Sequence, residues 1–223
     1  MARFLKIPAT STGGIAPWSL GVTGFSNRWD ATLLTDPAGT NVLTLPDDIG
    51  TLDLTAPNTN TRTLTDTGVF KYIAFPAGSS VGLQRIPAET GGFTDGFTVA
   101  IVAKITTGNA VFAKIGGYAF EFGGNGKINC YNYAATTQTV NTATSGTGWH
   151  IIVASFNGAS TKLTVDGTVY TPATFAAPTT YQNMYFGGGT NAIDGVLMAT
   201  HPTVLSDADR LTVHNTIKTR LGI

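Results

Sequence analysis

Charged side chains are scarce in this chain of 223 residues. Lys, Arg, Asp and Glu together make up only 12% of it, and 13 basic residues balance 13 acidic ones. A protein that binds nucleic acid neutralises phosphates with clusters of Lys and Arg, and this sequence contains no such cluster. We therefore expect no nucleic-acid partner. The balanced charge also provides little repulsion between copies of the chain, which suits a protein that assembles.

The chain also has only one cysteine and no long apolar run. The single Cys130 cannot form an internal disulfide and lies in the apolar segment 127–133, so we expect it to be a small buried side chain. No run approaches the length of a membrane span, and Lys6 and Pro8 interrupt the short apolar patch at the N-terminus. These features predict a soluble protein that is made in the cytoplasm without a signal peptide and has no membrane partner.

Acidic residues arranged for catalysis are missing as well. Glycosidases on β-sandwich folds need two carboxylates that face each other, and the only glutamates are Glu89 and Glu121, with no second acid at strand spacing from Glu121. His150, His201 and His214 lie neither four residues apart on a helix nor beside a suitable carboxylate. We expect no enzyme and no catalytic residue, unless groups distant in the sequence converge in space.

The main feature of the sequence is a series of short runs of β-branched and aromatic residues, separated by Gly or Asn. Apolar residues alternate along 97–105, which predicts a strand with one well-buried face. Both faces of 150–156 are apolar, which favours a central strand. The Asp166-Gly167 pair between two such runs is typical of a two-residue hairpin turn. The pattern predicts an all-β domain, and antiparallel sandwiches commonly reach this length.

One helix is expected at about residues 207–221. Ser206 is a good N-cap, Asp209 follows three residues later, and Gly222 ends the segment. Its expected buried stripe consists of Val213, Ile217 and Leu221. Residues 1–28 match no pattern, so we expect an N-terminal arm or accessory strand there and a sandwich that occupies residues 29–223.

Several segments, taken in order, resemble the laminin-G-like members of the concanavalin A-like lectin-glucanase superfamily. They include FTDGFTVAIVAKI, GWHIIVASFNGASTKLTVDGT and the C-terminal stretch that closes with LSDADRLTVHNTIKTRLGI. The most specific features are the Trp-His strand that leads into the Val-Asp-Gly hairpin and the closing helix. The resemblance covers roughly residues 65–223 and more loosely DDIGTLDLT in the first third. It implies an antiparallel two-sheet jelly-roll sandwich with one C-terminal helix.

Proteins of this superfamily usually act outside cells, whereas this sequence has no disulfide pair, no signal peptide and no Asn-x-Ser/Thr sequon. A bacteriophage protein reaches the exterior by lysis and needs none of these features. Our leading hypothesis is therefore a non-catalytic structural or adhesive virion protein, on the head or tail, made in the host cytoplasm. Its expected partners are other virion proteins and further copies of itself, arranged as a homo-oligomer on the particle.

The alternative hypothesis is a carbohydrate-binding, lectin-like module whose partner is a surface glycan. The resemblance implies aromatic platforms and Asn or Asp hydrogen bonds on one face or at loop tips. The candidate contact residues are Tyr118, Tyr131, Tyr133, Tyr181 and Tyr185. Tyrosines at these positions could equally well fill the core or cover a sheet.

Relatives in the superfamily often bind Ca²⁺ with loop carboxylates, and four aspartates could contribute: Asp47, Asp48, Asp53 and Asp194. A hard cation needs several converging oxygens, which the spacing does not indicate, so we expect no cofactor and no required metal. We expect Trp149 to anchor the core and Asp166 to form a turn.

Overall fold

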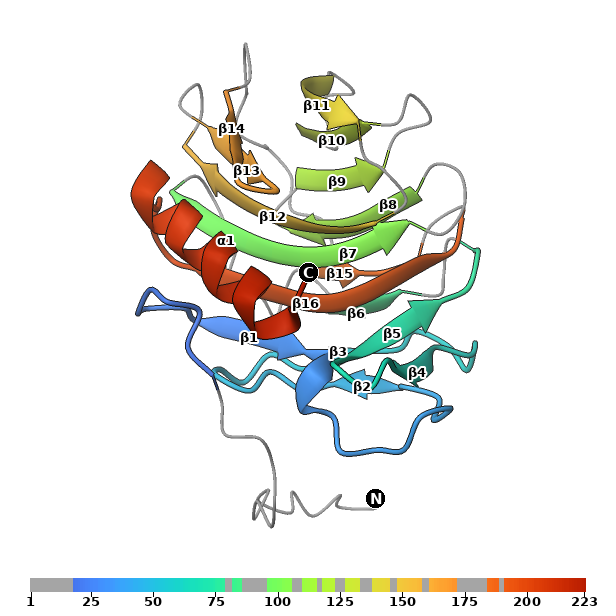
Figure 1. The fold of residues 1–223 in the computed structure, drawn as a ribbon. Helices are drawn as coiled ribbons and strands as arrows, with labels where there is room; N and C mark the ends of the chain where they lie inside the picture. Colours follow the sequence, from blue (N-terminus) through green and yellow to red (C-terminus); the bar gives the residue numbers. More distant parts are fainter. Residues whose placement is uncertain are drawn as a thin grey trace.

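The protein is built of three layers, an α-helix and two antiparallel β-sheets (Figure 1). The structure is a computed structural model. It describes residues 18–78, 82–85, 96–105, 110–115, 118–122, 127–132, 138–144, 148–157, 161–171, 184–188 and 191–223. The expected all-β two-sheet sandwich with one C-terminal helix is confirmed. Along the described part of the chain, no helix has the length and apolarity needed to cross a membrane.

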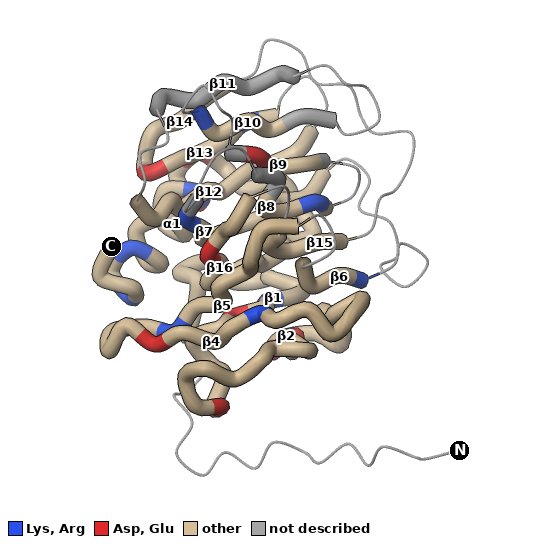
Figure 2. Tube along the Cα trace, turned by 90° about the vertical axis from the view of Figure 1, so that its right-hand side faces the viewer, with Lys and Arg blue, Asp and Glu red and all other residues tan. Residues whose placement is uncertain are grey.

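The front sheet lies against the helix and has eight strands. Its order is β14 (Thr168–Tyr170), β13 (Lys162–Val165), β12 (Trp149–Phe156), β7 (Phe97–Ile105), β16 (Ile193–His201), β5 (Lys71–Phe75) and β4 (Thr63–Asp66), and β1 (Asn27–Asp30) also pairs with β16. The eight strands of the back sheet follow the order β11 (Gln138–Thr144), β10 (Lys127–Asn132), β9 (Tyr118–Phe122), β8 (Ala110–Ile115), β15 (Met184–Phe186), β6 (Leu83–Arg85), β3 (Leu54–Thr55) and β2 (Thr44–Leu45). Charged residues of both signs are interspersed over the strands and loops (Figure 2).

The main core lies between the two sheets. In β7, the predicted alternation is confirmed because Phe97, Val99 and Ile101 are buried in this core. The ring of Phe156 from the front sheet stacks on Phe97 at 4.9 Å and meets Phe120 of the back sheet edge-on at 5.8 Å. These rings join the inner faces of the two sheets.

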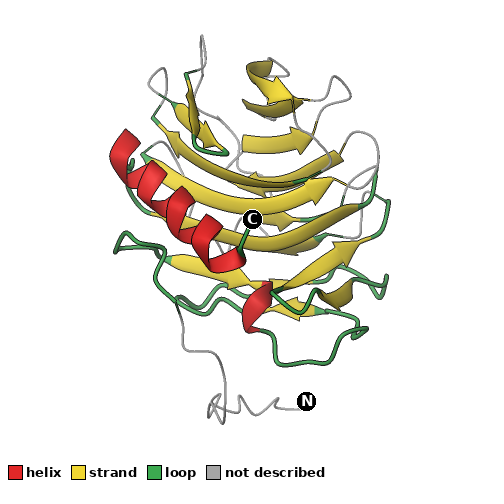
Figure 3. Cartoon of the chain, in the orientation of Figure 1, coloured by secondary structure: helices red, strands yellow, loops and turns green. Residues whose placement is uncertain are grey.

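The only α-helix of the described residues, α1 (Asp207–Leu221), covers the outer face of the front sheet (Figure 3). Its predicted stripe is buried against apolar side chains of β7, β12 and β16. The Ser206 hydroxyl accepts a hydrogen bond from the Asp209 amide at 3.1 Å, and Gly222 adopts the left-handed conformation with φ of 69°. The predicted cap and the predicted end are both confirmed.

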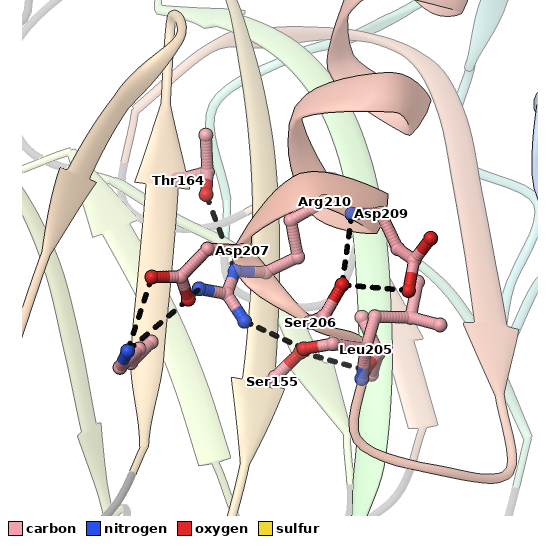
Figure 4. A network of polar contacts seen from close by, with 9 residues as sticks. Ser155, Thr164, Leu205, Ser206, Asp207, Asp209 and Arg210 are labelled. Carbon is pink, nitrogen blue, oxygen red and sulfur yellow. Dashed lines mark hydrogen bonds and ion pairs between the residues drawn. The ribbon is translucent and has the colours of Figure 1, made fainter.

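A buried arginine of α1, Arg210, binds the helix to the front sheet (Figure 4). Arg210 is only 1% exposed, and its Nε donates to Thr164 Oγ1 of β13 at 3.2 Å. Its Nη1 donates to the Leu205 carbonyl at 2.7 Å, and its Nη2 pairs with Asp207. Each nitrogen of the buried guanidinium therefore has a hydrogen-bond or ion-pair partner, as the burial of a charged group requires.

The β13–β14 hairpin turns at Asp166 and Gly167, whose φ angles are 49° and 83°. Two successive positive φ values are what a type I′ turn needs, which confirms the expected turn. The first third of the chain contains short strands and the 3₁₀ helix η1 (Ala31–Leu33). Residues 1–17 lie outside the described residues, and β1 spans the expected boundary at residue 28, so the separate N-terminal arm stays a prediction.

Candidate functional site

An aromatic patch lies on the outer face of the front sheet, and it consists of Phe70, Tyr72, Lys104, Trp149 and Asp194. Its strands are β12, β7, β16 and β5, with Phe70 directly before β5. Trp149 pairs in register with Lys104, and Lys104 pairs with Asp194. Residues opposite one another in adjacent strands share a face, so these side chains stand in one row.

The rings of the patch meet edge to face. Trp149 lies 5.4 Å from Phe70 and 5.3 Å from Tyr72, with interplanar angles of 75° and 68°. Trp149 and Tyr72 remain partly exposed at the margin of the apolar layer beneath α1. We expected Trp149 to anchor the core, but its position at the start of β12, on the outer face, leaves part of its surface accessible.

Electrostatic interactions hold the ammonium group of Lys104 near these rings. Its Nζ lies 5.0 Å from the ring centre of Trp149 and 5.6 Å from that of Tyr72, within the range of a cation–π interaction. The same Nζ pairs with Asp194 Oδ2 at 2.9 Å. The Lys104 side chain is 26% exposed and that of Asp194 8%, so the ammonium group is the more accessible partner of the pair.

This arrangement suits a ligand with both apolar and hydroxyl groups. Aromatic faces accept the C–H side of a sugar ring, while an ammonium and a carboxylate supply a hydrogen-bond donor and acceptor beside it. Ala74, opposite Asp194 in the same row, adds only a methyl group. A β-bulge between Gly195 and Leu197 bends β16 next to Asp194, and bulges of this kind re-aim side chains beside functional sites.

A pocket of about 250 Å³ adjoins the patch and shares Phe70 with it. Asp66, Lys71 and Arg220 are among its lining residues, so its walls carry both signs of charge.

Three of the five tyrosines predicted as glycan contacts belong to described strands, and these strands are not those of the aromatic patch. Tyr185 is in β15 of the back sheet, where Lys114 Nζ lies 5.8 Å from its ring centre, and burial raises the pKa of its hydroxyl to about 12. Tyr118 and Tyr131 belong to β9 and β10, but their side chains are outside the described part. Tyr133 and Tyr181 lie outside the described residues. A glycan-binding role for these five residues stays a prediction.

His150 has a carboxylate partner that the sequence did not reveal. Its Nδ1 lies 2.7 Å from Asp166 Oδ2 across the β12–β13 pair. Burial alone would raise the pKa of Asp166, but the hydrogen bonds from His150 and the Ile151 amide lower it below its ordinary value. The expectation that no histidine lies beside a suitable carboxylate is wrong, because antiparallel pairing joins residues that are far apart in the sequence.

The four aspartates considered for calcium bind groups of the protein itself. Asp47 accepts hydrogen bonds from several backbone amides, among them that of Gly50 at 2.8 Å, and Asp48 pairs with Arg28. Asp53 accepts from the Asp47 amide at 3.0 Å, and Asp194 binds Lys104. Within the described residues, no group of three or more His, Cys, Asp or Glu side chains could hold a metal ion. That the chain needs no metal or cofactor stays a prediction.

Comparison with solved structures shows what this architecture resembles. Trypanosoma rangeli sialidase in complex with sialic acid matches with a TM-score of 0.64 at 12% identity, over 89% of this chain and 34% of that one. The receptor-binding domain of botulinum neurotoxin D matches with a TM-score of 0.63 at 10% identity, over 88% and 53%. The binding domain of Paraclostridial Mosquitocidal Protein 1 matches with 0.64 at 11%, over 89% and 53%. No family model and no curated protein matches the sequence.

The chain shares the two-sheet β-sandwich fold of these structures. It spans about a third of the length of the sialidase chains and about half of the two toxin domains. The prediction that the protein is not an enzyme is overturned, because the fold matches chains of sialidases, which are enzymes, and the sandwich therefore gives no ground for excluding catalysis. None of these three matches concerns a virion protein.

Proposed function

We propose that this protein is a carbohydrate-binding module that binds a saccharide on the aromatic patch. The observation that carries the proposal is the partly exposed pair of rings, Trp149 and Tyr72, which encloses the Lys104–Asp194 ion pair. The solved structures that share the fold support a binding role, since they include the receptor-binding domain of a toxin.

The charges of the patch indicate the kind of saccharide. Lys104 and Asp194 neutralise each other at 2.9 Å, so the patch offers one donor and one acceptor without a net field. A strongly acidic sugar would have to compete with Asp194 for the ammonium group. A neutral sugar can stack on Trp149 and place hydroxyl groups against both charges, so we infer a neutral sugar.

The test is a glycan array followed by calorimetry with the best ligand. Tyr72→Leu removes one ring and one cation–π contact from the patch, and we expect the dissociation constant to rise about tenfold, equivalent to about 1.4 kcal/mol. Tyr170→Leu is the matched control, because Tyr170 is also a partly exposed tyrosine of the front sheet but packs against the other face, at the far end. Equal affinities for the two variants, or an array without a hit, would refute the proposal.

A virion surface is the setting that we propose for this binding, with other virion proteins and copies of the chain as partners. The support comes from the sequence alone: balanced charge, a single cysteine and no glycosylation sequon. Adhesion to host polysaccharide would then combine many weak contacts into a strong one. Cryo-electron microscopy of particles from the native source tests this setting, and particles without matching density would contradict it.

A further inference from the structure

A groove follows one side of α1, where the helix faces the segment that begins at Trp18. Its largest part is a hollow of about 570 Å³ that is lined by Trp18 and by helix residues up to Arg220. Trp18 also lines a hollow of about 350 Å³ that contains Ile49, and Arg220 also lines the pocket of about 250 Å³ that contains Val69. Because neighbouring hollows share a wall, the three form one elongated groove with Trp18 and Arg220 where they meet.

Exposed apolar side chains mark the two outer hollows of this groove. Ile49 is 46% exposed, and Val69, at 73%, is the most exposed large hydrophobic residue of the described part. Val22 and Phe25 extend the apolar wall beside Ile49, and Leu221 lies in the hollow with Val69. A partner that covers these side chains gains the free energy of removing them from water.

The middle of the groove carries a positive charge without an acidic partner. Arg28 is neutralised by Asp48, whereas Arg220 is exposed and forms no hydrogen bond or ion pair with any residue that the structure describes. The Arg220 guanidinium carbon lies 6.0 Å from the ring centre of Trp18, and Trp18 Nε1 donates to Asp30 Oδ2 at 2.8 Å. An arginine beside a ring that is fixed in this way can offer its planar row of donors to a carboxylate.

The other charges in the groove are already balanced. Asp66 and Lys71 lie opposite one another in register, the Asp66 carboxylate accepts from the Gly68 amide at 2.8 Å, and Lys71 Nζ donates to the Leu34 carbonyl at 2.8 Å. A cation in the last turn of a helix also interacts favourably with the helix dipole, but Lys218 in the same turn does so equally and lines none of the three hollows.

We propose that this groove binds an extended acidic peptide segment of a partner protein, with a carboxylate on Arg220 and an apolar side chain on either side of it, one toward Ile49 and one toward Val69. A peptide carries both kinds of group, whereas an acidic sugar would leave the apolar hollows uncovered. Residues 1–17 of this chain contain Arg3 and Lys6 but neither Asp nor Glu, so they cannot supply the carboxylate. The proposal does not depend on sugar binding at the aromatic patch.

Fluorescence anisotropy with labelled synthetic peptides tests the proposal. Each peptide carries one Glu between two Leu, with one, two or three Ser on each side of the Glu, and a matched series carries Gln in place of Glu. We expect at least one Glu peptide to bind in a saturable way, its Gln analogue to bind about tenfold more weakly, and glucuronic acid not to compete. Failure of every Glu peptide, equal binding of the Gln series, or displacement by glucuronic acid would overturn the proposal.

Variants of the full chain then locate the site. Arg220→Gln should raise the dissociation constant of the Glu peptide about tenfold, whereas Lys218→Gln, which removes the same charge from the same turn, should bind as the parent does. Ile49→Asn should weaken binding several-fold, with Leu43→Asn as its control, because Leu43 is 49% exposed and lies outside the groove. Tyr72→Leu should bind the peptide normally, so the two proposed sites can fail separately.

Two outcomes would contradict this assignment. Equal losses in Arg220→Gln and Lys218→Gln would show that the general charge of the helix end, and not the groove, attracts the peptide. A homo-oligomer that Ile49→Asn dissociates, together with no peptide binding, would show by light scattering that another copy of the chain covers the groove.

Discussion

At the residue scale, Asp166 shows how one side chain serves a turn, a strand and a neighbouring histidine. It occupies a left-handed position of the hairpin, accepts a hydrogen bond from the Ile151 amide at 2.9 Å and lies beside His150. Its side chain is 47% exposed, so solvent screens part of the charge. The bonds nevertheless outweigh burial and lower the pKa of the carboxyl group.

The lowered pKa predicts a pH-dependent contribution to stability. Ionised Asp166 stabilises the fold above its unfolded pKa of about 3.9, and this contribution is lost as the pH falls through the lower folded pKa. Asp166→Asn tolerates the same backbone conformation but cannot ionise. We expect it to lower the free energy of unfolding by about 1 kcal/mol at neutral pH, after allowance for screening, and by less as the pH falls below about 4.

Urea denaturation across this pH range measures the effect. Asp36→Asn, at an exposed position of a loop, is a suitable control and should change little at either pH. A deficit for Asp166→Asn that stayed constant from neutral to acidic pH would mean that turn geometry, and not charge, is what the aspartate contributes.

At the scale of elements, α1 depends on its first turn. Ser206 both accepts from the Asp209 amide and donates to the Asp209 carboxylate at 2.7 Å, which is a reciprocal cap. Ser206→Ala leaves a helix amide without its partner, and we expect the free energy of unfolding to fall by about 1 kcal/mol. Thermal or urea denaturation would show this loss, whereas the exposed Thr219→Ala within the same helix should be neutral or slightly stabilising. Identical losses in both variants would argue against the cap.

Elements with a local signature could be predicted from the sequence. The strand of residues 97–105 alternates, the Asp166-Gly167 turn has a known preference, and Ser206 precedes a periodic apolar stripe; each pattern involves residues within a few positions of one another. The aromatic patch has no such pattern. Tyr72 and Asp194 are brought together by the register of β5 and β16, and that register follows from the whole sandwich and not from either segment.

At the scale of the whole molecule, the position of the aromatic patch on one sheet limits what a single chain can do. A chain with one sugar-binding site cannot bridge two sugar-coated surfaces, whereas a homo-oligomer carries several copies of the site and can bridge them. We therefore expect beads that carry the sugar of the aromatic patch to be agglutinated only by an assembled form of the protein. Tyr72→Leu should raise the protein concentration that agglutination needs, because each copy of the site then binds more weakly.

Light scattering coupled to size-exclusion chromatography determines the number of chains in each particle of the protein. A monomer should bind single beads without agglutinating them, and a homo-oligomer should agglutinate them. Agglutination by a monomer would contradict this expectation, because it would require a second sugar-binding surface on the same chain.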